Sequence, residues 1–283
     1  MTIKRALGMA AFASLLGNGA QAQSLETVAA SRQERGERSL SVHVTFGMGD
    51  FSMTRDQGSA LYRANIVYDS ERFDPVLEYA NGQLQLGVDS DGDRLRNLKA
   101  IRGQRVDLSV SPRVPLSLDF EFGAGKADLD LGGLALERVE VRTGASEAAI
   151  QFSRPTTRPC ERFEVEMGAA QLQVEGLGNS NCSQIDVRGA AGSLVLDFTG
   201  EWQHEGVTEA NVELGLGDLM LRFPSNLGVS IEIERFLASF DADGFTKQGD
   251  RYISANYEQS ASKLHIDLKA IVGDVEVEWI PGR

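Results

Sequence analysis

The sequence contains few of the residues from which catalytic and metal sites are built. Its 283 residues include three histidines, His43, His204 and His265, and two cysteines. No histidine lies near another histidine or a cysteine at the spacing of zinc ligands, and no nucleophile-elbow motif is present. We therefore expect no metal ion, no cofactor and no catalytic residue.

Positive charge is also scarce. The chain carries 28 Lys and Arg against 41 Asp and Glu, a formal net charge of −13. This sign excludes a nucleic-acid-binding protein, because phosphate backbones recruit basic surfaces. It also disfavours anionic lipid surfaces. Cationic peptides, polyamines and metal ions are the partners that the charge permits.

Long hydrophobic runs are absent after the first residues, so we expect no membrane-spanning segment. The start of the chain has the three parts of an export signal. The bases Lys4 and Arg5 precede a short apolar run over 6–16, and Ala20-Gln21-Ala22 forms a small-residue cleavage site. This predicts a signal peptide over residues 1–22, cleaved after Ala22, and a mature chain that is periplasmic or secreted.

What the chain does contain is a repeat of two alternating apolar runs around a small corner residue. Five residues before each corner stands Val, Ile, Leu or Phe, and further apolar residues follow the corner by two and four positions. A fixed period of this size indicates stacked repeats, in which each unit buries its apolar face against its neighbours. The corner residues are Gly49, Gly125, Ser146, Ala170, Gly192, Gly217, Ala238 and Gly273.

Within each repeat the apolar residues alternate with period two, which is typical of strands. Leu118 and Phe120 point one way, for example, and Asp119 points the other. The steps between successive corners from Gly125 to Ala238 are 21, 24, 22, 25 and 21 residues. We therefore predict an all-β, single-stranded β-solenoid in which each step stacks one coil of about 21–25 residues on the previous one.

The domain organisation follows from where the repeat is interrupted. Residues 23–38 are polar and charged, and we expect a flexible leader there. Residues 39–283 are expected to form one solenoid domain with two insertions, 58–110 and 241–262, that hold β-hairpins. The first insertion and the chain end at 279–281 are expected to cap the two ends of the stack. The hairpin turns are expected at Asn81-Gly82 and at Gln248-Gly249-Asp250.

The two cysteines occupy the same position on successive coils. Cys160 lies ten residues before corner Ala170, and Cys182 lies ten before corner Gly192. Stacked strands run about 4.8 Å apart, which lies within the Cα separation that a disulfide allows. In an exported chain this predicts a Cys160–Cys182 disulfide.

An acidic column is predicted on the outer face of the coils, six residues before each corner. It can be read as a linear face that recruits cationic ligands, or as a solvated face, softened by bases two residues further on, that opposes aggregation. Asn211 interrupts the column in the sequence. The candidate ligand-face residues are Asp119, Glu140, Glu164, Asp186, Glu232 and Asp267.

One other stretch resembles a ligand motif but lacks parts of it. Asp89, Asp91 and Asp93 alternate as the first ligands of a calcium loop would. Arg94 and Ala100 stand where such a loop needs glycine and a carboxylate, so we interpret the stretch as a polar turn.

The chain resembles the toast-rack family, the β-solenoid domain also found in LiaF-like cell-envelope stress proteins. The resemblance spans nearly the whole mature chain and rests on the order and spacing of several short strings. It implies a solenoid fold and gives no enzyme motif, so no catalytic residue is carried over. The strings are Phe46-Gly47-Met48-Gly49-Asp50-Phe51, Tyr68, Pro75-Val76-Leu77-Glu78-Tyr79, Phe122-Gly123-Ala124-Gly125-Lys126-Ala127-Asp128-Leu129, and Asp250-Arg251-Tyr252 through Tyr257.

These observations favour a non-catalytic, exported β-solenoid that acts as a binding, adhesion-like or envelope-stress-sensing module. Its expected partner is an envelope protein or a cationic peptide, and its solenoid ends offer surfaces for oligomerisation. Two alternatives remain. One is a carbohydrate-active enzyme that uses scattered carboxylates from adjacent coils, and the other is a purely structural envelope component.

Overall fold

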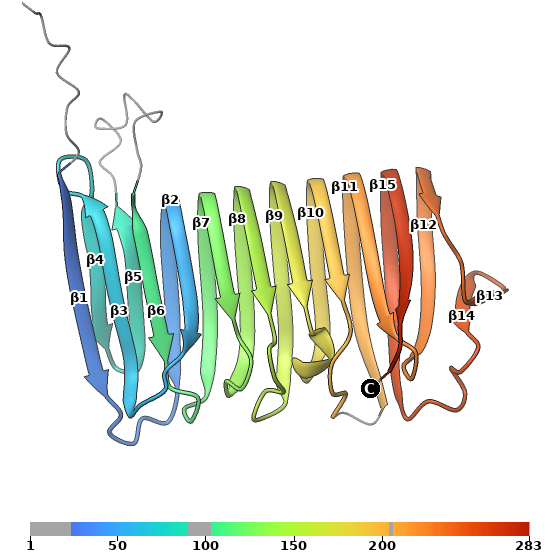
Figure 1. Cartoon of the computed structure of the whole chain (residues 1–283), viewed down its shortest axis with the longest axis horizontal. Coiled ribbons are helices and arrows are strands. Elements are labelled where there is room, and N and C mark those ends of the chain that lie inside the picture. The colour runs from blue at the N-terminus through green and yellow to red at the C-terminus, as the bar shows by residue number, and fades with distance from the viewer. Residues whose placement is uncertain (1–23, 90–102, 204–205, 283) are drawn as a thin grey trace, which may run out of the picture.

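The computed structural model describes residues 24–89, 103–203 and 206–282. The predicted signal peptide lies outside these residues, as do Asp91 and Asp93 of the polar turn. The described chain forms one sheet of 15 strands, which run across the long axis of the molecule and are stacked side by side along it (Figure 1). The all-β fold class is confirmed.

Eight long strands form the body of the molecule, and each carries one predicted corner within it. They pair in parallel, with corner opposite corner, as in Gly49↔Gly125, Gly125↔Ser146 and Gly192↔Gly217. The predicted solenoid register is therefore confirmed. The strands are β2 (Leu40–Arg55), β7 (Leu116–Asp130), β8 (Leu136–Gln151), β9 (Cys160–Glu175), β10 (Cys182–Asp197), β11 (Gly206–Pro224), β12 (Gly228–Phe240) and β15 (Ser262–Ile280).

The corner requires a residue without Cβ where coils approach most closely. Gly125 has φ 125°, and a Cβ on it would lie 1.9 Å from the carbonyl oxygen of Gly49 in the preceding coil. Gly123, two residues earlier, does not have a positive φ, yet a Cβ there would lie 2.3 Å from the carbonyl oxygen of Gly47. Close approach of neighbouring backbones is thus the constraint at both positions.

The order of strands departs from the predicted order at one point. β15, the last strand of the chain, lies between β11 and β12 and pairs in parallel with both. The 21-residue step from Gly217 to Ala238 therefore does not join stacked neighbours, and that part of the prediction is wrong. The placement of β15 between these strands is compatible with the core because Leu268 lies in register between Val212 and Ile233. Apolar side chains thus continue unbroken through the inserted strand.

The first end of the stack is covered by the insertion before β7. It holds β3 (Ala60–Asp69), β4 (Asp74–Ala80), β5 (Gln83–Asp89) and β6 (Arg105–Val110). β4 and β5 form the expected hairpin, with Asn81 and Gly82 at positive φ in the turn. β5 pairs with the first half of β2 and β6 with its second half.

The flexible leader expected over residues 23–38 is wrong, because the segment contains strand β1 (Leu25–Gln33). β1 pairs in antiparallel fashion with β3 along its length and forms the outermost strand at this end (Figure 1). Val28 and Ala30 alternate along β1 and pack against the core. Their burial stabilises a segment whose outward side chains are polar.

The other end is covered only in part. β13 (Phe245–Gln248) and β14 (Arg251–Ser254) form the expected second hairpin, and β14 pairs with residues 230–232 of β12. The chain end does not cap the stack as predicted, because Trp279 lies on the inserted strand β15. There its ring packs against Phe223 and Phe245, with centroids 5.4 and 5.3 Å away.

Candidate functional site

The predicted acidic column exists as a row across the sheet. The parallel register places its members side by side on successive strands, at the spacing of about 4.8 Å that separates strands. His43 on β2 extends the row beyond Asp119. In spatial order the row, here called the acidic ladder, is Asp119, Glu140, Glu164, Asp186, Asn211, Asp267 and Glu232.

Arginines from the adjacent rows bridge the middle of the acidic ladder. Arg142 pairs with Glu140 and with Asp119, at 3.2 Å from the latter. Arg188 lies 3.2 Å from Glu164. These bridges reduce the attraction that the middle of the ladder can offer to a mobile cation.

Asp186 is the one member of the acidic ladder that is buried. Its Oδ1 accepts a hydrogen bond of 2.7 Å from Nδ2 of Asn211, and its Oδ2 lies 3.6 Å from Nη1 of Arg162 without a hydrogen bond. Asn211, which interrupts the column in the sequence, therefore serves as a neutral donor to the buried carboxylate.

A second row, two residues nearer the corner, alternates in sign. Because β15 lies between β11 and β12, Lys269 separates Glu213 from Glu234, which occupy the same position in successive repeats of the sequence. Burial lowers the pKa of Arg188, but the hydrogen bond from Arg188 to Glu166 and the nearby Glu164 charge outweigh it and keep the pKa above its usual value. In spatial order this alternating row is Glu121, Arg142, Glu166, Arg188, Glu213, Lys269 and Glu234.

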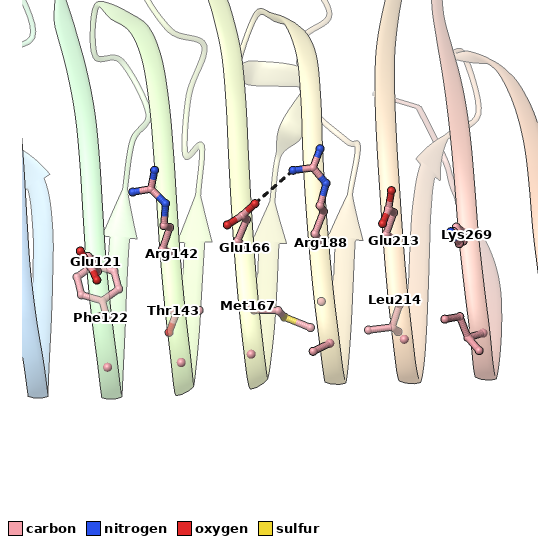
Figure 2. A pocket seen from close by; sticks show the side chains of 17 residues that line it. Glu121, Phe122, Arg142, Thr143, Glu166, Met167, Arg188, Glu213, Leu214 and Lys269 are labelled. Atoms are coloured by element: carbon pink, nitrogen blue, oxygen red, sulfur yellow. Dashed lines mark hydrogen bonds and ion pairs between the residues drawn. The ribbon is translucent and has the colours of Figure 1, made fainter.

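The part of the alternating row from Glu121 to Lys269 forms one wall of an open groove of about 710 Å³ that crosses β7 to β11 and β15. Figure 2 shows the charged side chains in one line across the strands and Phe122, Thr143, Met167 and Leu214 in a second line beside them. The backbone at the row two residues before the corner completes the lining. We call this feature the corner groove; its small-residue floor is Gly123, Gly144, Gly168, Ala190 and Gly215.

The glycine floor is enforced by the stacking of the coils. A Cβ on Gly144 would lie 2.5 Å from the carbonyl oxygen of Gly123, and one on Gly168 would lie 2.8 Å from that of Gly144. The same rows that permit close stacking thus leave backbone open to a ligand. The groove was not predicted from the sequence, because no binding role was assigned to the glycines two residues before the corners.

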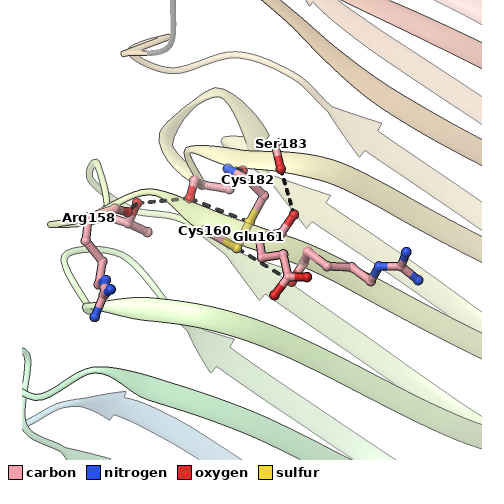
Figure 3. The surroundings of a disulfide bond; sticks show 8 residues. Arg158, Cys160, Glu161, Cys182 and Ser183 are labelled. Atoms are coloured by element: carbon pink, nitrogen blue, oxygen red, sulfur yellow. Dashed lines mark hydrogen bonds between the residues drawn. A yellow bond between two sulfur atoms is a disulfide. The ribbon is translucent and has the colours of Figure 1, made fainter. Parts of the chain in front are cut away.

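The predicted disulfide is present. Cys160 and Cys182 start β9 and β10, face each other in the parallel ladder, and have Cα atoms 4.1 Å apart (Figure 3). Beside the bond, Ser183 Oγ donates a hydrogen bond of 2.9 Å to the carbonyl oxygen of Glu161. The bond ties two successive coils together at their first rung.

One constellation has the spacing of a catalytic triad. His43 lies 2.9 Å from Asp119 through Nδ1 and 3.0 Å from Thr45 Oγ1 through Nε2. β2 is paired on both edges at this level, with β5 and β7, so the ladders engage the backbone N–H groups that an oxyanion hole would need. The His43 side chain is also about half exposed, so water has access to it. This arrangement does not provide the parts of an acyl-transfer site.

Among the described residues, no group of three or more His, Cys, Asp or Glu side chains is arranged to hold a metal ion. His265 pairs with Tyr257 and lies 3.4 Å from Glu209, while His204 falls outside the described chain. No helix in the described ranges is long and apolar enough to cross a membrane.

A parallel stack of bent coils defines a β-solenoid domain. Residues 18–175, more than half of the chain, match the N-terminal domain of toast_rack, DUF2154. The chain belongs to this family, as the short glycine-rich strings predicted. A comparison with curated proteins found no match.

Solved structures match the chain at low identity. A proposed cell adhesion protein from Clostridium sporogenes is 16% identical, with 90% of this chain and 100% of that one covered and a TM-score of 0.48. A proposed adhesin from Bacteroides fragilis is 10% identical, with 90% and 98% covered and a TM-score of 0.39. A proposed lipid-binding protein from Parabacteroides distasonis is 12% identical, with 90% and 96% covered and a TM-score of 0.24. Likenesses of this degree say nothing about what this chain binds.

Proposed function

We propose that this chain is a non-catalytic, exported binding module that holds an extended polypeptide segment in the corner groove. The observation that carries the proposal is the local balance of charge. The groove is lined by three acids and three bases on a chain whose net charge is −13. The lining acids and bases are Glu121, Glu166 and Glu213, and Arg142, Arg188 and Lys269.

The dimensions of the groove suit such a segment. The groove crosses six strands, so five spacings give it a length of about 24 Å. An extended chain rises about 3.3 Å per residue, and about seven residues fit this length. The glycine floor allows a ligand backbone to approach closely, and the alternating charges favour side chains of both signs.

A polypeptide fits the lining better than a glycan or a polycation. Sugar rings stack on exposed aromatic faces, and Phe122, the aromatic residue of the groove lining, is buried. A polycation gains little from a row in which bases alternate with acids. The carbohydrate-active and cation-recruiting alternatives therefore have less support than the peptide-binding one.

Export to an oxidising compartment is part of the proposal. The Cys160–Cys182 disulfide supports it, because structural disulfides persist outside the cytoplasm. Expression of the full chain with its own leader should give a mature protein that starts at Gln23 and lies in the periplasm or the medium. Intact-mass measurement checks the cleavage site, and recovery of an uncleaved chain in the cytoplasm would contradict export.

The binding proposal is tested by selecting peptides from a random display library on the immobilised mature protein. Ala190→Arg fills the groove from its floor, where the alanine is exposed, and Ala149→Arg on β8 is a matched control at an exposed alanine outside the groove. We expect enriched peptides to bind the native protein and the control equally and to bind Ala190→Arg at least about tenfold more weakly.

Two results of that selection would contradict peptide binding in the groove. One is equal binding to both alanine variants, and the other is the failure of any sequence to enrich. Enrichment of purely basic peptides that lose binding on Asp267→Asn would instead assign binding to the acidic ladder.

A further inference from the structure

The outer edge of β12 is covered over only part of its length. β14 pairs with residues 230–232, and in the described parts of the chain the run from Ile233 to Phe240 has a ladder partner on the β15 side only. Outward-facing backbone N–H and C=O groups on this run are thus available to another strand. An open edge of this kind is a template for strand addition.

The same run carries the most exposed large apolar side chains of the described residues. Phe236 is 78% and Leu237 is 68% exposed. Leu237 is in register with Val272 on β15, which is in register with Leu216 on β11, and both of these are exposed as well. With Ile271 they form an apolar patch along the corner, continuous with the end of the corner groove.

This patch is a local change in the repeat. At the row one residue before the corner, the coils of β7 to β10 carry alanine, whereas β11, β15 and β12 carry large apolar residues. The alanines are Ala124, Ala145, Ala169 and Ala191. A contiguous apolar patch on an otherwise small-residue corner is typical of an interaction site.

The charges at this edge indicate what would face it. The alternating row ends on Glu234, for which the described residues provide no ion pair, so its next member would be a base. Where β14 does cover β12, it places Arg251 opposite Glu232, with Nε 3.2 Å from Oε2. β14, which already covers part of this edge, thus also places a base opposite an acid of β12.

We propose that the edge of β12 beyond β14 binds an extended segment of a partner polypeptide by strand addition, with a basic side chain opposite Glu234 and apolar side chains over Phe236 and Leu237. This site adjoins the end of the corner groove at Ile271, but the inference does not depend on the proposed function. Strand pairing satisfies the backbone of residues 233–240 and covers the apolar patch at the same time.

Two other occupants fit the edge less well. A second copy paired in antiparallel fashion and centred on Arg235 would bring two Arg235 side chains together, and like charges directly opposite each other oppose such pairing. A lipid surface would leave the outward backbone groups without hydrogen-bond partners.

The probe is a labelled peptide with the sequence of residues 268–275, capped at both ends, added to the mature protein. Those residues pair with β12 on its inner edge and present Lys269 opposite Glu234, so the peptide has the required charge and shape. We expect anisotropy to report binding, and hydrogen exchange to slow along residues 233–240. Phe236→Ser should weaken binding at least about tenfold, and the groove variant Ala190→Arg should leave it unchanged.

A charge swap provides the decisive comparison. Glu234→Lys should weaken the binding of the peptide with the native sequence. A second peptide, in which glutamate replaces the lysine, should bind the Glu234→Lys variant better than it binds the native protein. Phe236 and Glu234 are exposed, so melting curves should show that each variant folds.

Several results would overturn the proposal. They are no binding up to about 1 mM peptide, indifference to the charge swap, or faster exchange on β15, which would mean that the peptide displaces β15. A concentration-dependent dimer lost in Phe236→Ser would assign the edge to a second copy. Flotation with phosphatidylcholine vesicles that is lost in the same variant would assign it to lipid.

Discussion

Lys269 on β15 lies directly opposite Glu234 on β12 in the parallel ladder. On its other side the same lysine faces Glu213 on β11. The two glutamates belong to successive repeats in the sequence, so direct stacking of those repeats would place them next to each other. The last strand of the chain therefore separates like charges as well as completing the core.

Reversing this charge should destabilise the stack. Lys269→Glu places three acids on adjacent strands, and like charges directly opposite each other are unfavourable. We expect the free energy of unfolding in urea to fall by about 1 kcal/mol at low salt and the loss to shrink in about 0.5 M salt. Lys269→Gln adds no repulsion, so its free energy of unfolding should lie between those of the native protein and Lys269→Glu. A loss that does not change with salt would contradict this account.

The corner glycines can be tested by a matched pair of substitutions. Gly125→Ala places a methyl group 1.9 Å from the oxygen of Gly49 and strains a φ of 125°, so we expect a loss of about 3 kcal/mol. Gly47→Ala meets nothing within 4 Å and should change the urea midpoint little. Equal midpoints for the two variants would show that coil contact does not set the glycine requirement.

Removing the disulfide should loosen one joint of the stack. Cys160 and Cys182 are separated by 22 residues, and chain-entropy arguments assign a loop of this size about 3 kcal/mol of stabilisation. The double serine variant should therefore unfold at lower urea than the oxidised native protein. The reductant dithiothreitol should lower the native midpoint to the variant's value and leave the variant unaffected. A variant that still responds to reductant would disprove the assignment.

Asp56, in the turn after β2, makes the stability of the fold depend on pH. Burial raises the pKa of Asp56, but hydrogen bonds from Arg63 and from the N–H groups of Gly58 and Ala60 outweigh it and hold the pKa below its usual value. A lowered folded-state pKa contributes stability above the unfolded-state value of about 3.9, and this is lost as pH falls through the folded pKa.

Asp56→Asn tests this dependence directly. We expect the variant to be less stable than the native protein at pH 7 by about 1–2 kcal/mol, and the difference to shrink as pH falls below about 3.9. Urea midpoints measured between pH 7 and pH 2 give the comparison. A difference that stays constant across that range would rule out a contribution from the ionised carboxylate.

The spacing of the corners predicted the register of the coils, because a stacked repeat allows only one alignment of its apolar positions. It did not predict that β15 lies between β11 and β12, since the period identifies a coil but not its place in the stack. β1 was missed because Val28 and Ala30 are weak apolar signals among charged neighbours. The acidic ladder was predicted from spacing alone. The alternation of charge along the alternating row depends on the position of Lys269, which only the structure shows.

The position of β15 makes completion of the sheet depend on a strand that comes later in the sequence than both of its neighbours. Ribosomes deliver the chain from its first residue to its last, so β11 and β12 emerge before the strand that separates them. A prematurely terminated chain would lack an interior strand and leave two unpaired edges facing each other within the sheet. Such a product would have a gap inside the sheet instead of a frayed outer edge.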